Sequence, residues 1–222
     1  HDALPIFPDA SASTTSMALM LHLTSMCQRL PLRILQVRAP LLPHRLNEVE
    51  HTDLKLSKTV ARAKTSSPAA DVHTWVRSWA AEDNGQTARR TAWTAGQLVS
   101  LVRNTDTPLE PFALTYAALA LVCYCRTAHH GPGAPHPTVA LDRLVDRADA
   151  SVAQWIATGE GDATLEDVGS LTDPAAPEKL LRVCGERLLS LNVWRVGELL
   201  GRTLILLADE SGGDEVCVKE EA

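Results

Sequence analysis

The stretch PFALTYAALALVCYC, residues 111–125, decides the fold because it is apolar on nearly all sides. It is too short to cross a bilayer, and it carries Thr115 and Tyr116, so we expect no transmembrane segment. In a soluble chain, a segment that is apolar all round predicts a helix buried at the centre of the protein. The other elements of the chain are therefore expected to surround this helix.

Amphipathic helices are predicted on both sides of the central one. Apolar residues recur at helical spacing in segments 11–30, 72–79, 88–102, 141–156, 180–191 and 193–208. A weaker pattern allows a short helix within 46–63. Asn84 and Gly85 predict a left-handed turn that ends one helix, and Asp173 with Pro177 predicts the start of another. No alternating pattern of useful length predicts a strand. We therefore expect an all-α protein, an irregular helical bundle or helical stack of about seven or eight helices.

Length and composition agree with one globular domain and appended segments. The chain has 222 residues, of which 45% are hydrophobic and 22% charged. We expect an N-terminal helical segment (1–30), a basic and partly irregular connector (31–68), a helical domain (69–208) and an acidic flexible tail (209–222). The opening HDALPIFPDA has neither an initiator Met nor a charged region ahead of an apolar stretch. It predicts no signal peptide, and it suggests a piece of a longer chain.

The net charge of −6 argues against nucleic-acid binding by the chain as a whole. The charge is uneven, because the segment from Arg29 to Lys64 holds eight basic and three acidic residues, a local net charge of +5. Two interpretations of this segment remain open. It is either a solvated connector or a docking site for nucleic acid or a protein partner.

The cysteines predict reduced thiols and no disulfide framework, because they are odd in number and irregularly spaced. They are Cys27, Cys123, Cys125, Cys184 and Cys217. In CYCRTAHH, residues 123–130, Cys125 and His129 would share a helical face and could both bind a metal ion. Cys123 would point away from them, and a structural zinc site needs four ligands. We therefore expect core thiols followed by loop histidines.

Acidic residues offer a second candidate metal site. On a helix over 141–156, Asp142, Asp146 and Asp149 would share one face, as in a carboxylate metal site. Arg143 and Arg147 alternate with these acids, which favours an ordinary solvated face. The chain also lacks a G-x-S-x-G string, a phosphate-binding glycine loop and an H-E-x-x-H string. We therefore predict no catalytic, cofactor-binding or metal-binding residues in this chain, and no enzyme activity.

Several strings resemble the regulatory region of fungal transcription factors, especially those with two-Cys/two-His zinc fingers. ARRTAWTAGQLVSLVRN (88–104), followed by PFALTYAALALVCYC, is similar to a pair of helices in that family. The same pattern extends to Leu141-Asp142, WIATGEG (155–161), DVGSL (167–171) and EKLLRVCGERLLSLNVWRVGELLGRTL (178–204). The resemblance covers about residues 70–208 and rests on the order of these strings.

Within the first string, Thr94 stands where the family commonly has His, directly before Ala95, Gly96 and Gln97. Small residues let a neighbouring helix approach closely, so Ala95 and Gly96 are expected to pack against the helix over 112–125. Gln97 is expected to hydrogen-bond a facing backbone group.

The resemblance implies a non-enzymatic regulatory and interaction domain of a nuclear transcription factor that acts with RNA polymerase II. In such proteins the zinc fingers lie N-terminal to this region, and nothing before His22 has zinc-ligand spacing. Zinc and DNA binding are therefore expected only in fingers outside this chain. The expected partners are proteins of the transcription machinery and no membrane, and a homodimer remains open.

A different class of function is also open, because the chain is rich in tryptophan for its few aromatic residues. Trp75 and Trp79 either form a shelf for a ligand or belong to the hydrophobic stripe of a packed helix. A small all-α enzyme or a ligand-binding bundle could use a pocket near Trp75, Trp93 and Trp155. Buried titratable groups in one cavity would favour this alternative.

Overall fold

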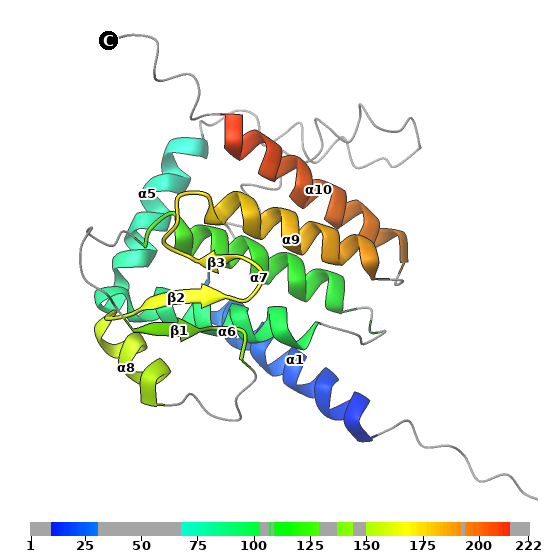
Figure 1. Cartoon of the computed structure of the whole chain (residues 1–222), viewed down its shortest axis with the longest axis horizontal. Helices are drawn as coiled ribbons and strands as arrows, with labels where there is room; N and C mark the ends of the chain where they lie inside the picture. Colours follow the sequence, from blue (N-terminus) through cyan, green and yellow to red (C-terminus); the bar gives the residue numbers. More distant parts are fainter. Residues whose placement is uncertain are drawn as a thin grey trace, which may run out of the picture.

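The computed structural model describes residues 10–30, 68–102, 107, 109–128, 137–143, 150–191 and 194–213, and these are mostly helical (Figure 1). The helices are α1 (Ala10–Arg29), α5 (Pro68–Ala81), the 3₁₀ helix η3 (Glu82–Gly85), α6 (Gln86–Leu101), α7 (Glu110–Cys125), α8 (Ala150–Thr158), α9 (Ala176–Ser190) and α10 (Trp194–Gly213). The prediction of a mainly helical protein is confirmed. The long helices, those of 14 residues or more, number six in the described residues instead of seven or eight.

Helix α7 lies at the centre of the described fold, as its apolar sequence predicts. Leu114, Ala117 and Leu121 are fully buried, and α7 packs against α1, α6, α9 and α10. Its many alanines let these neighbours approach closely. Phe112 is the exception, since 44% of its surface stays exposed at the start of the helix.

Helix α1, in the expected N-terminal helical segment, packs on the same core through α6. Leu19, Met26 and Leu30 are buried there. The indole Nε1 of Trp79, on α5, donates a hydrogen bond of 3.1 Å to the backbone oxygen of Arg29. Such a bond satisfies one of the carbonyls that the end of α1 leaves without a helical partner. The possible helix within 46–63 lies outside the described residues.

The turn between α5 and α6 is left-handed, as predicted from Asn84 and Gly85. Asp83, Asn84 and Gly85 have φ values of 50°, 55° and 82°. Arg89, one turn into α6, donates hydrogen bonds to the backbone oxygens of Asn84 (3.0 Å) and of Ile156 on α8 (2.8 Å). Burial lowers the pKa of Arg89. This one side chain therefore connects the turn, α6 and the last turn of α8.

Helices α9 and α10 lie side by side (Figure 1) and touch through glycine. A Cβ atom on Gly201 would lie 2.7 Å from the backbone oxygen of Gly185, and one on Gly185 would lie 2.9 Å from that of Gly201. The early proline predicted for α9 is confirmed, since Pro177 lies in its first turn, but the helix is capped by Ala175 without a side-chain bond, so the predicted cap at Asp173 is wrong. Asp173 instead accepts a hydrogen bond of 2.9 Å from the backbone N–H of Ala175 in the turn before the helix. Helix α10 continues to Gly213, so the prediction that this helix ends at residue 208 is wrong.

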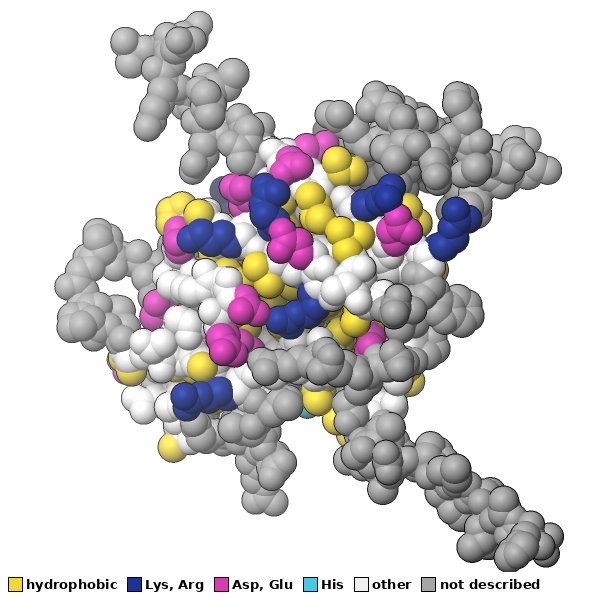
Figure 2. Space-filling view, turned by 45° about the vertical axis from the view of Figure 1, so that its right-hand side comes forward, with side chains coloured by type: hydrophobic (Ala, Val, Ile, Leu, Met, Phe, Trp, Pro, Cys, Tyr) yellow, Lys and Arg dark blue, Asp and Glu magenta, His cyan; other side chains and the backbone are white. Residues whose placement is uncertain are grey.

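The surface of this part of the molecule carries both signs of charge. Figure 2 shows basic and acidic side chains interspersed among apolar ones on one face. On α9 and α10, Arg182 pairs with Glu178 and Asp209, and Arg202 pairs with Glu198. These pairs are exposed, so each contributes little to stability.

A small sheet contradicts the prediction that the protein has no strands. Strand β1 (Thr138–Ala140) pairs in parallel with β2 (Asp162–Leu165), which pairs antiparallel with β3 (Gly169–Ser170). Helix α8 lies between β1 and β2 in the chain, so β1, α8 and β2 form a parallel crossover unit. The start of the helix predicted over 141–156 is wrong, because residues 138–143 form β1 and the turn after it. Residues 144–149 lie outside the described residues, and α8 covers Ala150–Thr158.

Candidate functional site

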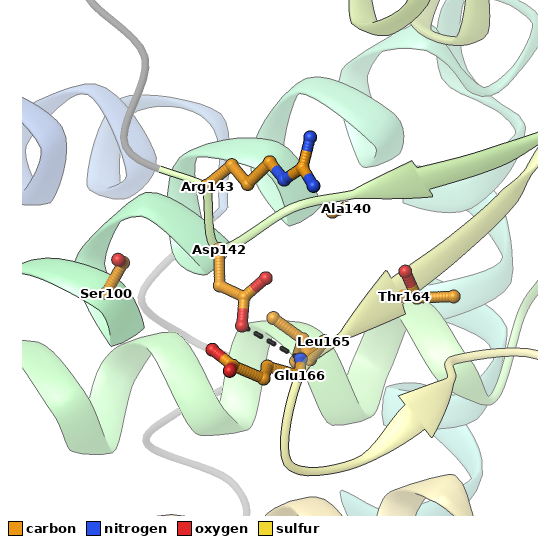
Figure 3. Close-up of a pocket in the computed structure, with 7 residues that line it drawn as sticks. All are labelled: Ser100, Ala140, Asp142, Arg143, Thr164, Leu165 and Glu166. Atoms are coloured by element: carbon orange, nitrogen blue, oxygen red, sulfur yellow. Dashed lines mark hydrogen bonds between the residues drawn. The ribbon is translucent and has the colours of Figure 1, made fainter.

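A pocket of about 640 Å³ lies at the carboxyl ends of the parallel strands β1 and β2 (Figure 3). It is lined by Ser100, Ala140, Asp142, Arg143, Thr164, Leu165 and Glu166. Residues that follow parallel strands meet at one edge of the sheet, which is where open parallel sheets bind ligands. The end of α6, which carries Ser100, forms the remaining wall.

Gln97 fixes the backbone beneath the pocket. Its Nε2 donates hydrogen bonds of 2.7 Å to the backbone oxygens of both Leu141 and Arg143, and only 1% of its surface is exposed. The prediction that Gln97 bonds a facing backbone group is therefore confirmed. A Cβ atom on Gly96 would lie 2.6 Å from the backbone oxygen of Leu141. The prediction that Gly96 packs against the 112–125 helix is wrong, because the turn after β1 occupies this place.

The two turns at the pocket rim are joined to each other. Asp142 Oδ2 accepts a hydrogen bond of 2.9 Å from the backbone N–H of Glu166, which follows β2. The backbone N–H of Leu141 donates a bond of 2.9 Å to the oxygen of Thr164. These bonds keep the rim in one arrangement.

The pocket combines opposite charges with hydroxyl groups. Figure 3 shows the carboxylate of Asp142 directed toward Glu166, the Arg143 side chain extending past the other side of the segment that follows β1, and the hydroxyl of Thr164 on β2. Asp142 is half-buried, whereas Arg143 and Glu166 are exposed. Chemically, the site can hold a cationic group against a carboxylate and an anionic group against the guanidinium.

The candidate metal ligands from the sequence do not come together in the described residues. Asp142 lies in the turn after β1 and not on a helix, while Asp146, Asp149 and His129 lie outside the described residues. In the described part of the chain, no group of three or more metal-ligating side chains occurs.

The described cysteines, Cys27, Cys123, Cys125 and Cys184, are free thiols. Burial raises the pKa of Cys125 and of Cys184 to about 12. Cys27 and Cys123 are half-buried.

The candidate tryptophans pack against different elements. Trp155 is fully buried, with its ring edge-to-face on Tyr124 of α7 at 6.0 Å between centroids. Trp93 makes the same kind of contact with His22 of α1 at 6.1 Å. Trp75 and Trp79 both belong to the packed stripe of α5, as the structural interpretation predicted. The strand-end pocket includes none of these four rings.

Sequence reasoning missed most of the pocket, because it missed the strands. Among the lining residues only Asp142 was considered as a possible ligand, and it was assigned with Arg143 to the solvated face of a helix. The available signals were the β-branched pair Thr138-Val139 after a Pro-rich loop and the turn glycines Gly159 and Gly161 just before β2.

Comparison with known proteins identifies no relative: no family model, no curated protein and no solved structure matches the chain. None of the described helices is both long enough and apolar enough to cross a membrane.

Proposed function

We propose that this chain contains the regulatory and interaction domain of a fungal zinc-finger transcription factor. The domain would span residues 69–208, as an irregular stack within a chain of about seven or eight helices. It would act in the nucleus, in transcription by RNA polymerase II. DNA would be bound by zinc fingers elsewhere in a longer protein.

One observation carries the proposal: two of the strings on which the resemblance rests touch each other directly. Gln97, in the first string, bonds the backbone oxygen of Leu141, which is 44 residues away and opens the Leu141-Asp142 string. Gly96 leaves the space into which Leu141 fits. Strings that define a family by their order are expected to make the contacts that hold its core together.

The closing pair of helices supports the proposal in the same way. The string from residue 178 to 204 contains nearly all of α9 and about the first half of α10, and its glycines Gly185 and Gly201 make the close crossing of the two helices. Packing contacts between these strings support the proposal, because an interaction domain depends on a stable core. A domain of this kind acts by protein contacts or by restraining an activation function. It needs no cofactor, and its partners would be proteins of the transcription machinery or a second copy of the chain.

The test is to fuse residues 1–222 to an unrelated DNA-binding domain and to measure transcription of a reporter gene in yeast. We expect activation or repression several-fold beyond that of the DNA-binding domain alone. The variant Gln97→Leu, which weakens the core, should return the reporter toward the level of the DNA-binding domain. Gln154→Leu, at an exposed position on α8, is the matched control and should leave the effect unchanged. A folded fusion that changes nothing would contradict the proposal.

A further inference from the structure

We propose that the strand-end pocket binds a small zwitterion, a free α-amino acid, with Arg143 on its carboxylate and Asp142 on its ammonium group. This inference goes beyond the proposed regulatory function and does not depend on it. It rests on the position of the pocket, on the hydrogen bonds that fix its backbone, on its charges and on its size.

The position is that of a ligand site in a parallel crossover unit. Strands β1 and β2 are parallel and α8 connects them, so the segments after both strands arrive at the same edge. Asp142 and Arg143 follow β1, and Glu166 follows β2. Polar residues at this edge belong to different turns but face one hollow, which is the usual origin of ligand contacts in such units.

Hydrogen bonds within the protein fix the backbone around the pocket before any ligand binds. Gln97 bonds the backbone on both sides of Asp142, at Leu141 and at Arg143. Asp142 Oδ2 is used by the backbone N–H of Glu166, so this carboxylate is fixed in direction. In the described part of the chain its other oxygen, Oδ1, accepts no hydrogen bond, so it is available to a donor. Groups that are oriented in advance lose little entropy when a ligand binds.

The charges of the pocket do not neutralise each other. Asp142 and Arg143 are neighbours in the chain and line the same pocket, yet no ion pair joins them in the described residues. By contrast, Arg182, Arg187 and Arg202 each pair with a carboxylate. A third charged side chain, that of Glu166, also lines the pocket and puts a second carboxylate beside Asp142 (Figure 3). A ligand with an ammonium group for this side and a carboxylate for the Arg143 guanidinium would match both signs of charge, whereas a purely anionic or purely cationic ligand would match only one.

The pocket has room for an amino acid, and its remaining surface offers contacts to the side chain of one. The volume of about 640 Å³ lies in the range of small-molecule sites. Ala140 and Leu165 offer aliphatic surface, and Ser100 and Thr164 offer hydroxyl groups, to the side chain of the ligand. A macromolecule would need a wider surface than this hollow provides.

The test measures binding of the standard amino acids to residues 1–222, first by thermal shift at about 10 mM each and then by calorimetry for those that stabilise the protein. For the amino acid that binds, the N-acetyl derivative lacks the positive charge and the methyl ester lacks the negative one. We expect each derivative to bind about tenfold or more weakly than the free amino acid.

Two variants test which side chain binds which charged group of the ligand. Asp142→Asn keeps an acceptor for the backbone N–H of Glu166 and removes the negative charge, so it should lose the preference for the free amino acid over its N-acetyl form. Arg143→Gln should lose the preference over the methyl ester. Arg90→Gln, an exposed position on α6 outside the pocket, is the control and should bind as the parent does.

The proposal is overturned if the folded parent protein shows no stabilisation by any amino acid at this concentration. It is also overturned if both pocket variants bind the free amino acid and its derivatives as the parent does. Neither result would bear on the reporter experiment, because that experiment needs no ligand.

Discussion

The side chain of Gln97 supplies the hydrogen-bond donors that a neighbouring strand would otherwise give to the backbone after β1. Strand β1 is followed by the carbonyls of Leu141 and Arg143, and the side chain of Gln97 supplies a donor to each at 2.7 Å. Buried carbonyls require such partners, because an unpaired one costs free energy. A residue that is unremarkable in a helix thus holds the only described sheet against α6.

Replacing Gln97 by Leu should lower the free energy of unfolding by about 2–4 kcal/mol, because two carbonyls lose their donors at once. Urea unfolding followed by circular dichroism measures the change. Gln154→Leu makes the same chemical change at an exposed position on α8 and should alter stability by less than about 0.5 kcal/mol. Equal effects of the two variants would show that the Gln97 bonds contribute nothing.

Cys184 gives the protein a dependence on alkaline pH. Its thiol has a pKa of about 12 in the folded protein, raised by burial from the ordinary value of 9.0. The unfolded chain therefore loses this proton first, and the contribution of the neutral thiol to stability is complete below about pH 9 and declines above it. We expect urea midpoints to fall between about pH 9 and 11, and to fall less steeply in Cys184→Ala. Parallel pH curves for the two proteins would be evidence against this account.

At the scale of elements, the α9–α10 crossing depends on how closely two backbones approach. Gly201 and Gly197 lie one turn apart on α10, but they meet α9 differently. A Cβ atom on Gly201 would lie 2.7 Å from the Gly185 oxygen, whereas one on Gly197 would lie 3.2 Å from the Leu188 oxygen. A Cβ atom on Gly201 would therefore force the two helices apart, whereas one on Gly197 would need only a small shift of the neighbouring backbone.

Gly201→Ala should therefore destabilise the protein by about 1–3 kcal/mol despite the better helix propensity of alanine. For Gly197→Ala, the gain in helix propensity of about 1 kcal/mol should offset most of the steric cost. Thermal melts of the two variants in one buffer make the comparison. A Gly201→Ala protein that melts no lower than Gly197→Ala would mean that the crossing is looser than described.

Local patterns predicted those elements that depend on their own residues. The apolar run of α7, the left-handed turn at Asn84 and Gly85, and the early Pro177 of α9 are all set within a few positions of sequence. The strands could not be found in this way, because they have two to four residues and exist through pairing with one another. Leu141 shows why sequence patterns failed here. Its apolar side chain matched a helical stripe, but its backbone N–H donates a hydrogen bond to the oxygen of Thr164 in strand β2. The pocket follows from that pairing, so it could not be predicted either.

At the scale of the whole molecule, the distribution of charge determines whether the chain can bind a polyanion such as DNA. The net charge is −6, and the arginines Arg182, Arg187 and Arg202 are engaged with carboxylates. A DNA-binding face would need unpaired cations along one groove-sized surface. The face in Figure 2 instead alternates between the two signs.

Residues 1–222 alone should accordingly bind duplex DNA weakly and without sequence preference. A mobility-shift titration at physiological salt measures this, with a random duplex as the competitor. We expect dissociation constants no tighter than about 1 μM, which is the non-specific range. Tight binding that survives the competitor would assign a DNA-binding role to the chain itself.

The docking of α1 sets where the chain can be shortened. Cutting at residue 69, the start expected from the pattern of sequence, would take Leu19, Met26 and Leu30 out of the core and leave the Trp79 indole without its acceptor on Arg29. The apolar surface of α6 that these residues cover would then face water. The smallest fragment suitable for expression and crystallisation therefore begins before α1, and a boundary drawn by sequence similarity alone would yield an aggregating protein.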